Sequence, residues 1–162
     1  MIDREQVIGS MLRSPVLARA SNELLPPGCE FAQATQSEDW ARFDIKKAKQ
    51  ALDATKYRGG KDPATGNALS LKIVCDNNGE GLCNVIRNGL AELGIELESS
   101  LLDTAEYYEA LDKGEGQLFS YGWNLDYPIG QNIFQLFEAR NIGNGQENRN
   151  VTRYDVKEFE EA

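Results

Sequence analysis

The spacing of apolar residues predicts a chain that alternates between strands and helices. Every second residue is apolar at the start of 69–77, which indicates a strand. Residues 81–94 instead place Leu, Val and Ile three or four positions apart, the pattern of an amphipathic helix that ends at Gly94. Residues 95–103 alternate apolar residues with glutamate, and 117–124 form a third apolar run. We expect both to be strands.

Further helices are predicted at 2–12, 44–57 and 105–114, and a helix or a helical turn at 129–140. Their starts carry residues that can cap a helix, namely Asp3, Asp44, and either Asp103 or Thr104. Residues 14–40 are expected to be a loop, because the Pro-Pro-Gly run at 26–28 is incompatible with regular structure. A loop of that length inside a compact domain is unusual and is often functional.

The order strand, helix, strand, helix, strand predicts an α/β fold, with a small and largely parallel sheet flanked by helices. Ligands of such sheets bind at the carboxyl ends of the strands. The three loops at those ends are therefore the places to look for a site, at 75–81, 101–105 and 122–130.

Composition narrows the classes of function. The chain has 162 residues, a net charge of -9 and no histidine. The negative charge argues against unassisted binding to nucleic acid, and the lack of histidine removes Ser-His-Asp and Cys-His catalysis within this chain. No apolar run is long enough to cross a membrane, and the first residues do not form a signal peptide. We expect no enzyme activity, no cofactor and no metal site.

The first two loops offer weak candidates. The glycines of 75–81 could face an anion, but the motif lacks the spacing of a phosphate loop, and a turn with left-handed Asn and Gly residues explains it as well. Cys75 and Cys83 could form a disulfide or could be two core thiols. Four carboxylates follow the strand ends and could converge on a cation, or could simply be solvated: Asp76, Glu80, Asp103 and Glu106.

The third loop, "GWNLDYPIG", is the strongest candidate. Trp123 and Tyr127 offer apolar faces with polar tips, which suit a ligand. Asp126 lies just past the predicted strand, where a carboxylate can pair with an ammonium group. The same residues also suit an ordinary structural corner.

The order of motifs resembles the extracellular solute-binding proteins of ABC importers, family 5, the peptide, dipeptide and nickel group. "MIDREQVIG" is similar to the family's "AIDRE" helix, and "FDIKKAKQALDATKY" to "YDPEKAKALLAEAGY". "GQLFSYGWNLDYPIGQNIFQLF" resembles "FQLFLYGWNADYPDPENFLFLF". The likeness extends over most of the chain.

The resemblance implies a periplasmic-binding-protein-like lobe. Residues 1–162 would be a single, partial C-terminal lobe of a two-lobed protein that closes on a small molecule or peptide, and the remainder of the parent chain would supply the opposite wall. It also implies delivery to an ABC permease, a bacterial periplasmic or extracellular location at the membrane, and no nucleic-acid partner. A family aspartate that pairs with the ligand's α-amino group corresponds to Asp126. The predicted ligand-binding residues are Asp126, Trp123, Tyr127, Asn124 and Tyr121.

Two departures bear on specificity. The family's "DYPDP" is "DYPIG" here, so Ile129 replaces an acidic residue and Gly130 a proline beside the ligand. The same domain type also occurs as the sensor of bacterial transcriptional regulators, and this is the alternative function. A signal peptide or a helix-turn-helix upstream of this chain would distinguish the two.

Overall fold

The sheet has three parallel strands in the order β2-β1-β3. The computed structural model describes residues 2–12, 18–21, 23–29, 42–143 and 150–160. The strands are β1 (Ser70–Asp76), β2 (Glu96–Leu102) and β3 (Leu118–Phe119). This confirms the predicted α/β fold with a small parallel sheet. β3 is shorter than the predicted 117–124, because β1 ends soon after the point where the two strands pair and little partner strand remains.

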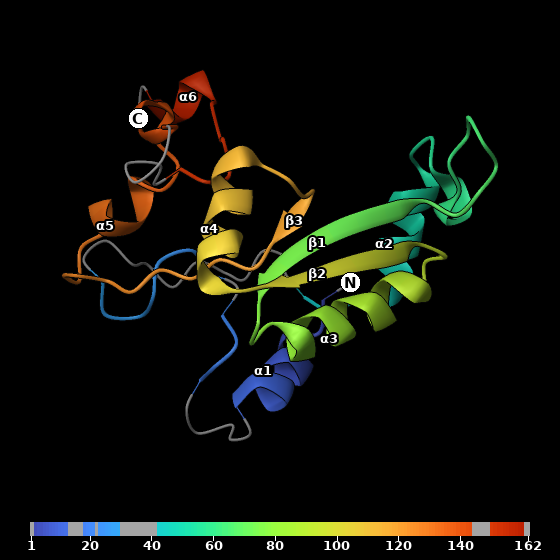
Figure 1. Cartoon of the computed structure of the whole chain (residues 1–162), viewed down its shortest axis with the longest axis horizontal. Helices are drawn as coiled ribbons and strands as arrows, with labels where there is room; N and C mark the ends of the chain where they lie inside the picture. Colours follow the sequence, from blue (N-terminus) through green and yellow to red (C-terminus); the bar gives the residue numbers. More distant parts are fainter. Residues whose placement is uncertain (1, 13–17, 22, 30–41, 144–149, 161–162) are drawn as a thin grey trace.

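The described residues form six α-helices (Figure 1). They are α1 (Arg4–Leu12), α2 (Ile45–Asp53), α3 (Glu80–Ala91), α4 (Thr104–Lys113), α5 (Gln131–Phe134) and α6 (Lys157–Glu160), with 3₁₀ turns at Arg58–Gly60 and Ala139–Asn141. Of these helices, α3 and α4 pack against the sheet. The predicted caps are confirmed. Asp3 accepts from the backbone of the first turn of α1, Asp44 from that of α2, and Asp103 rather than Thr104 from that of α4.

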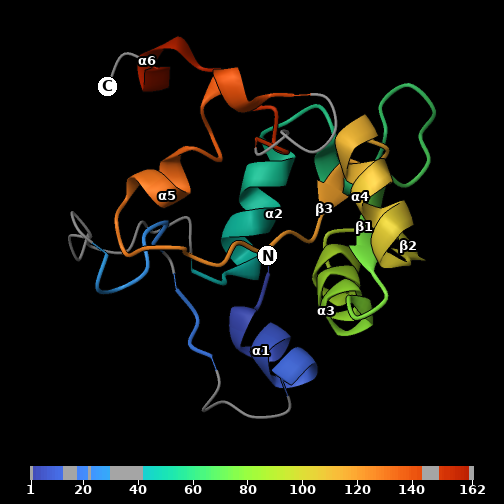
Figure 2. The same cartoon turned by 60° about the vertical axis from the view of Figure 1, so that its left-hand side comes forward.

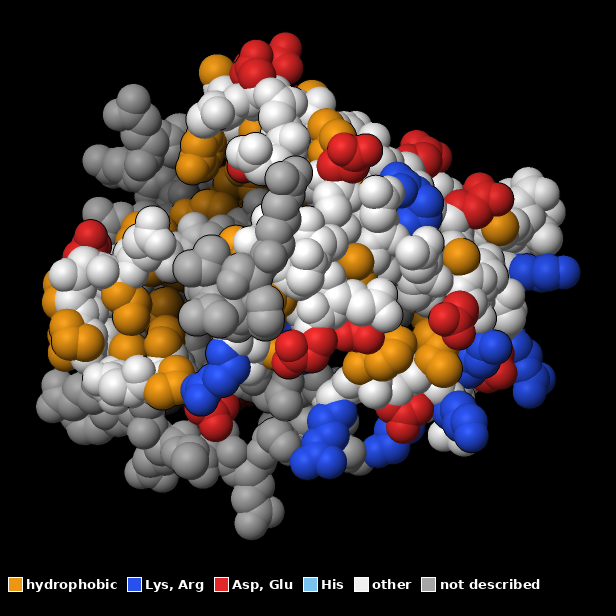
Figure 3. Space-filling model, turned by 90° about the horizontal axis from the view of Figure 1, so that it is seen from below, with side chains coloured by type: hydrophobic (Ala, Val, Ile, Leu, Met, Phe, Trp, Pro, Cys, Tyr) orange, Lys and Arg blue, Asp and Glu red, His pale blue; other side chains and the backbone are white. Residues whose placement is uncertain are grey.

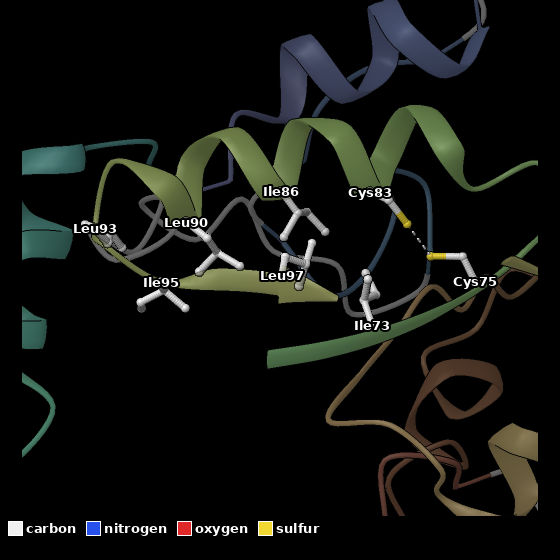
Figure 4. Packing of buried hydrophobic residues seen from close by; sticks show 8 residues of the cluster. All are labelled: Ile73, Cys75, Cys83, Ile86, Leu90, Leu93, Ile95 and Leu97. Carbon is white, nitrogen blue, oxygen red and sulfur yellow. Dashed lines mark hydrogen bonds between the residues drawn. The ribbon is translucent and has the colours of Figure 1, made fainter. Parts of the chain in front are cut away.

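β1 is the central strand, and helices cover both of its faces. Toward α3 lies the larger apolar cluster (Figure 4), formed by Ile73, Cys75, Cys83, Ile86, Leu90, Leu93, Ile95 and Leu97. Toward α4 lies a second cluster, formed by Val74, Tyr107, Ala110, Leu111 and Val151. Three successive residues, 73–75, are therefore buried, which the apolar alternation at the start of the strand did not indicate.

A close backbone contact fixes the connection between α2 and β1. Gly60 has φ +71°, and a Cβ there would lie 2.4 Å from the carbonyl oxygen of Leu93. Gly94, which ends the α3 turn as predicted, has φ +74°, and its Cβ would lie 2.8 Å from the carbonyl oxygen of Gly59. Glycine at both positions therefore lets the two turns touch through their backbones.

The chain after β3 runs past the carboxyl end of the sheet to α5 and then to α6 (Figure 1). In the turned view these two helices again lie away from α1 and α3 (Figure 2). The described parts of the predicted 14–40 loop, 18–21 and 23–29, hold no helix or strand, and the rest lies outside the described residues. Within the described part of the chain, no helix has the length and apolar character needed to cross a membrane.

Candidate functional site

The loop after β3 and the short helix α5 are joined by a chain of side-chain hydrogen bonds. The indole Nε1 of Trp123 donates to Oδ1 of Asn132 at 2.7 Å. Nδ2 of the same asparagine lies 3.4 Å from Oδ2 of Asp126. Asn132 thus connects the two side chains that the sequence singled out, although they are three positions apart on a loop with no regular structure.

Asn132 is 1% exposed, which is unusual for an asparagine. Its backbone N–H donates to the carbonyl of Ile129 at 3.1 Å in the turn that begins α5. Because the backbone is held in this turn, the amide projects inward toward Trp123. Sequence reasoning missed this residue. The feature of the sequence that could have indicated it is a polar residue directly before Ile133 in an apolar run.

The carboxylate of Asp126 is exposed to solvent on one side and borders the amide of Asn132 on the other. Its contact with the amide is near the length limit of a hydrogen bond and is therefore weak. A carboxylate has about four acceptor sites, so it retains capacity for a cationic donor. The group lies beside the half-buried Trp123, whose indole face can exclude water from an ammonium group bound there.

A cavity of about 900 Å³ lies on the inner side of this loop. Its walls come from the end of α4, β3, α5 and the segment 151–153, with Leu24 and Pro26 at one side. Two of the predicted site residues, Tyr121 and Trp123, line it, whereas Asp126, Tyr127 and Asn124 do not. The carboxylate of Asp126 therefore lies outside the cavity.

Exposed apolar side chains surround the same region. Hydrophobic atoms gather at the end of the molecule where α5 lies, whereas charges of both signs cover the other end (Figure 3). Tyr127 is 46% exposed and Phe134 is 37% exposed. These aromatic surfaces and the cavity together make this end suited to a partly apolar ligand.

Tyr107 holds the start of the loop against α4. Its hydroxyl donates to the carbonyl oxygen of Ser120, the first residue after β3. Burial raises its pKa to about 12, and nearby Cys75 adds to the shift. Burial also raises the pKa of Tyr121, with Tyr108 contributing. Both phenols are neutral at physiological pH, and that of Tyr107 acts as a hydrogen-bond donor.

The other two strand-end loops carry local structure. Asp76 accepts from the backbone of Asn78 at 3.0 Å, and Asp103 caps α4. Among the residues described, no three His, Cys, Asp or Glu side chains are placed to hold a metal ion. The left-handed glycine expected in the turn at 75–81 is wrong. Gly79 has φ −79°, and glycine is required there because a Cβ would lie 2.4 Å from the Cβ of Cys75.

Parallel strands joined by crossover helices define an α/β fold of the kind whose ligands bind beyond the carboxyl ends of the strands. The chain belongs to the bacterial extracellular solute-binding proteins of family 5, whose middle-region model matches residues 1–145. This is a family of solute-binding proteins and not of enzymes. No curated protein matches the sequence.

Solved structures confirm the periplasmic-binding-protein fold. The chain is similar to the periplasmic binding protein DppA of Helicobacter pylori in complex with the peptide STSA, with a TM-score of 0.78 and 19% identity, over 99% of this chain and 29% of that one. It is also similar to a periplasmic oligopeptide-binding protein from Borrelia burgdorferi, with a TM-score of 0.73 and 19% identity, over 99% of this chain and 30% of that one. The chain spans less than a third of the length of these proteins.

Proposed function

We propose that residues 1–162 form part of one lobe of a two-lobed protein that delivers a short peptide to an ABC importer, outside the bacterial cytoplasm. The observation that carries this proposal is the placement of Asp126 beyond the carboxyl end of a parallel sheet, next to the indole of Trp123 and connected to it by Asn132. The partners are the peptide, the permease and the rest of the parent chain.

The proposed chemistry is capture of the peptide's free α-ammonium group. In open solvent one carboxylate holds an ammonium group weakly, because water competes for both charges. Closure of a second lobe over Asp126 would remove that water and make the ion pair much stronger. The exposure of Asp126 in this lobe fits a site that a ligand can enter before closure.

The aromatic side chains would bind the rest of the ligand without selecting its sequence. Tyr121 and Trp123 line the cavity, and Tyr127 and Asn124 lie exposed on the same loop as Asp126. Tyrosine and tryptophan rings pack against many side chains and still offer a polar tip. In support, two proteins of similar fold are described as binding peptides.

The test uses the full-length parent protein, the peptide Ser-Thr-Ser-Ala and its N-acetylated form, with binding measured by calorimetry. Asp126→Asn should weaken binding of the free-amine peptide by at least about tenfold, because the variant leaves the ammonium group without its counter-charge. Binding of the acetylated peptide should be unchanged. The matched control is Glu96→Gln, an exposed carboxylate at the amino end of β2, which should change neither.

Equal loss for the free and acetylated peptides would remove Asp126 from the ammonium-binding role. A parent protein that binds no member of a panel of free-amine peptides would overturn the peptide ligand itself.

A further inference from the structure

Two cysteines meet in the core where β1 ends and α3 begins. Cys75 is the penultimate residue of β1 and Cys83 lies in the first turn of α3. Both side chains are buried, at 0% and 1% exposure, and their Sγ atoms lie 3.0 Å apart (Figure 4). Both thiols are free in this structure. The peptide-binding site described above does not use them.

The surrounding backbone holds the two cysteines in place. Cys75 is paired with Leu101 in the β1–β2 ladder. The backbone N–H of Cys83 donates to the carbonyl of Gly79 at 2.9 Å, which anchors the start of α3 over the end of the strand. Gly79 lies against the Cβ of Cys75, in a space that no larger residue could occupy. Bonded sulfurs are about 2.04 Å apart, so a bond requires an approach of only about 1 Å.

We propose that Cys75 and Cys83 form an intramolecular disulfide in the mature protein. Each thiol loses one proton and one electron, and the new bond joins the two Sγ atoms. The oxidant is a disulfide, either of a thiol oxidase or of oxidised glutathione, which accepts both electrons and both protons and leaves as two thiols. The proposal rests on the proposed location outside the cytoplasm, where such oxidants maintain disulfides.

Burial determines when this bond forms and how long it lasts. Burial raises the pKa of the Cys75 thiol to about 12, and its contact with Cys83 adds to the shift. The thiolate is the attacking species, so oxidation of the folded, reduced protein is slow. The bond therefore forms while the chain folds. Once it is formed, the surrounding core keeps external thiols away from it.

A peptide map tests the bond directly. No Lys or Arg lies between Lys72 and Arg87, so trypsin releases both cysteines in the single peptide 73–87. Cys29 leaves in a different peptide, 20–42, and serves as the internal control. The full-length parent is unfolded, refolded with oxidised glutathione, and then unfolded again in denaturant so that the buried thiols become accessible. It is treated there with iodoacetamide without reduction, digested and analysed by mass spectrometry.

Peptide 73–87 should carry no alkyl group and should be lighter than the reduced peptide by two hydrogen atoms, whereas Cys29 should be alkylated. Cys29→Ser should keep the bond and Cys83→Ser should lose it. Alkylation of both cysteines in 73–87, or a crosslink between 73–87 and 20–42, would overturn the proposal.

A second arm separates the chemistry from the location. Parent protein exported by its own leader and alkylated at lysis should already carry the bond. A bond that forms on refolding but is missing from the exported protein would overturn its presence in the mature protein. Neither arm depends on the ligand, so failure of the peptide proposal leaves this test intact.

Discussion

Two regions of the molecule are held together by different forces. The unit β1–α3–β2 is built from apolar side chains that touch across the sheet face, with Leu90 and Ile73 each 1% exposed. Residues 120–143 with 150–160, here called the C-terminal segment, pack around two buried asparagines. Asn132 and Asn150 are 1% and 0% exposed. In the first region the contacts are non-directional. The second region adds hydrogen bonds with specific partners to a few buried apolar side chains such as Leu136.

Asn150 shows how the C-terminal segment is held. Its Nδ2 donates to the carbonyls of Glu138 at 3.1 Å and Tyr154 at 2.8 Å, and its Oδ1 accepts from the backbone of Tyr154 at 3.1 Å. Aromatic rings add edge contacts, such as Tyr154 with Phe159 at 5.6 Å between centroids. One amide thus fixes parts of the chain that share no sheet or long helix.

The difference bears on where we propose that the binding site lies. A region held by many distributed apolar contacts does not depend on any single polar group, and its shape changes little. A region held by a few directed bonds can adjust when a ligand arrives, because each bond can be exchanged for one to the ligand. The loop with Asp126 belongs to this second region. The Tyr107 bond to Ser120 anchors it to α4, which packs against β1 of the first region.

The largest expected effect tests the apolar region. Leu90→Ala should lower the free energy of unfolding by about 2–5 kcal/mol, because it removes buried methyl groups and leaves a cavity. Urea unfolding measures this value. The matched control is Leu101→Ala, at a side chain that is 41% exposed, which should cost much less. Equal losses in the two variants would contradict an apolar core centred on α3.

A smaller effect tests the polar region. Asn132→Leu keeps the number and branching of the side-chain heavy atoms but leaves the indole N–H of Trp123 unpaired, which should cost about 1–3 kcal/mol. Asn132→Asp keeps an acceptor for Trp123 but places a second negative charge beside Asp126. Asn132→Leu should also weaken binding of a free-amine peptide, because Asp126 loses its amide donor, whereas the added negative charge of Asn132→Asp should not. Urea unfolding and calorimetry measure the two effects. If Asn132→Leu stabilised the protein, apolar packing rather than hydrogen bonding would hold both regions.

The smallest effect tests the link between the regions through its pH dependence. Tyr107→Phe removes one hydrogen bond and should cost about 1 kcal/mol at neutral pH. The folded-state pKa of Tyr107 is raised from 10.0 to about 12, so its contribution is fully present below pH 10 and is lost as pH rises toward 12. The difference in unfolding free energy between the two proteins, measured by urea unfolding, should therefore shrink across that range. A difference in unfolding free energy that stays constant from pH 10 to pH 12 would contradict a raised pKa of the buried Tyr107 phenol.

The sequence predicted the apolar region better than the polar one, for a physical reason. Periodicity records repeated burial, so it located α3, β1 and β2, and local capping chemistry located Asp3, Asp44 and Asp103. Burial of Asn132 depends on one turn and two distant partners, which leaves no periodic trace. For the same reason the short β3 and the cavity beside it could not be foreseen.

The touching glycines at 60 and 94 have a practical consequence for protein engineering. Neither position has a side chain that could be made smaller. A larger residue at one glycine therefore cannot be accommodated by a second substitution at the other. The chain between Lys61 and Ala68 leaves and returns as a mostly exposed loop above that fixed base. Inserted tags or dye-attachment residues therefore belong at 63–67, where added length leaves the base untouched.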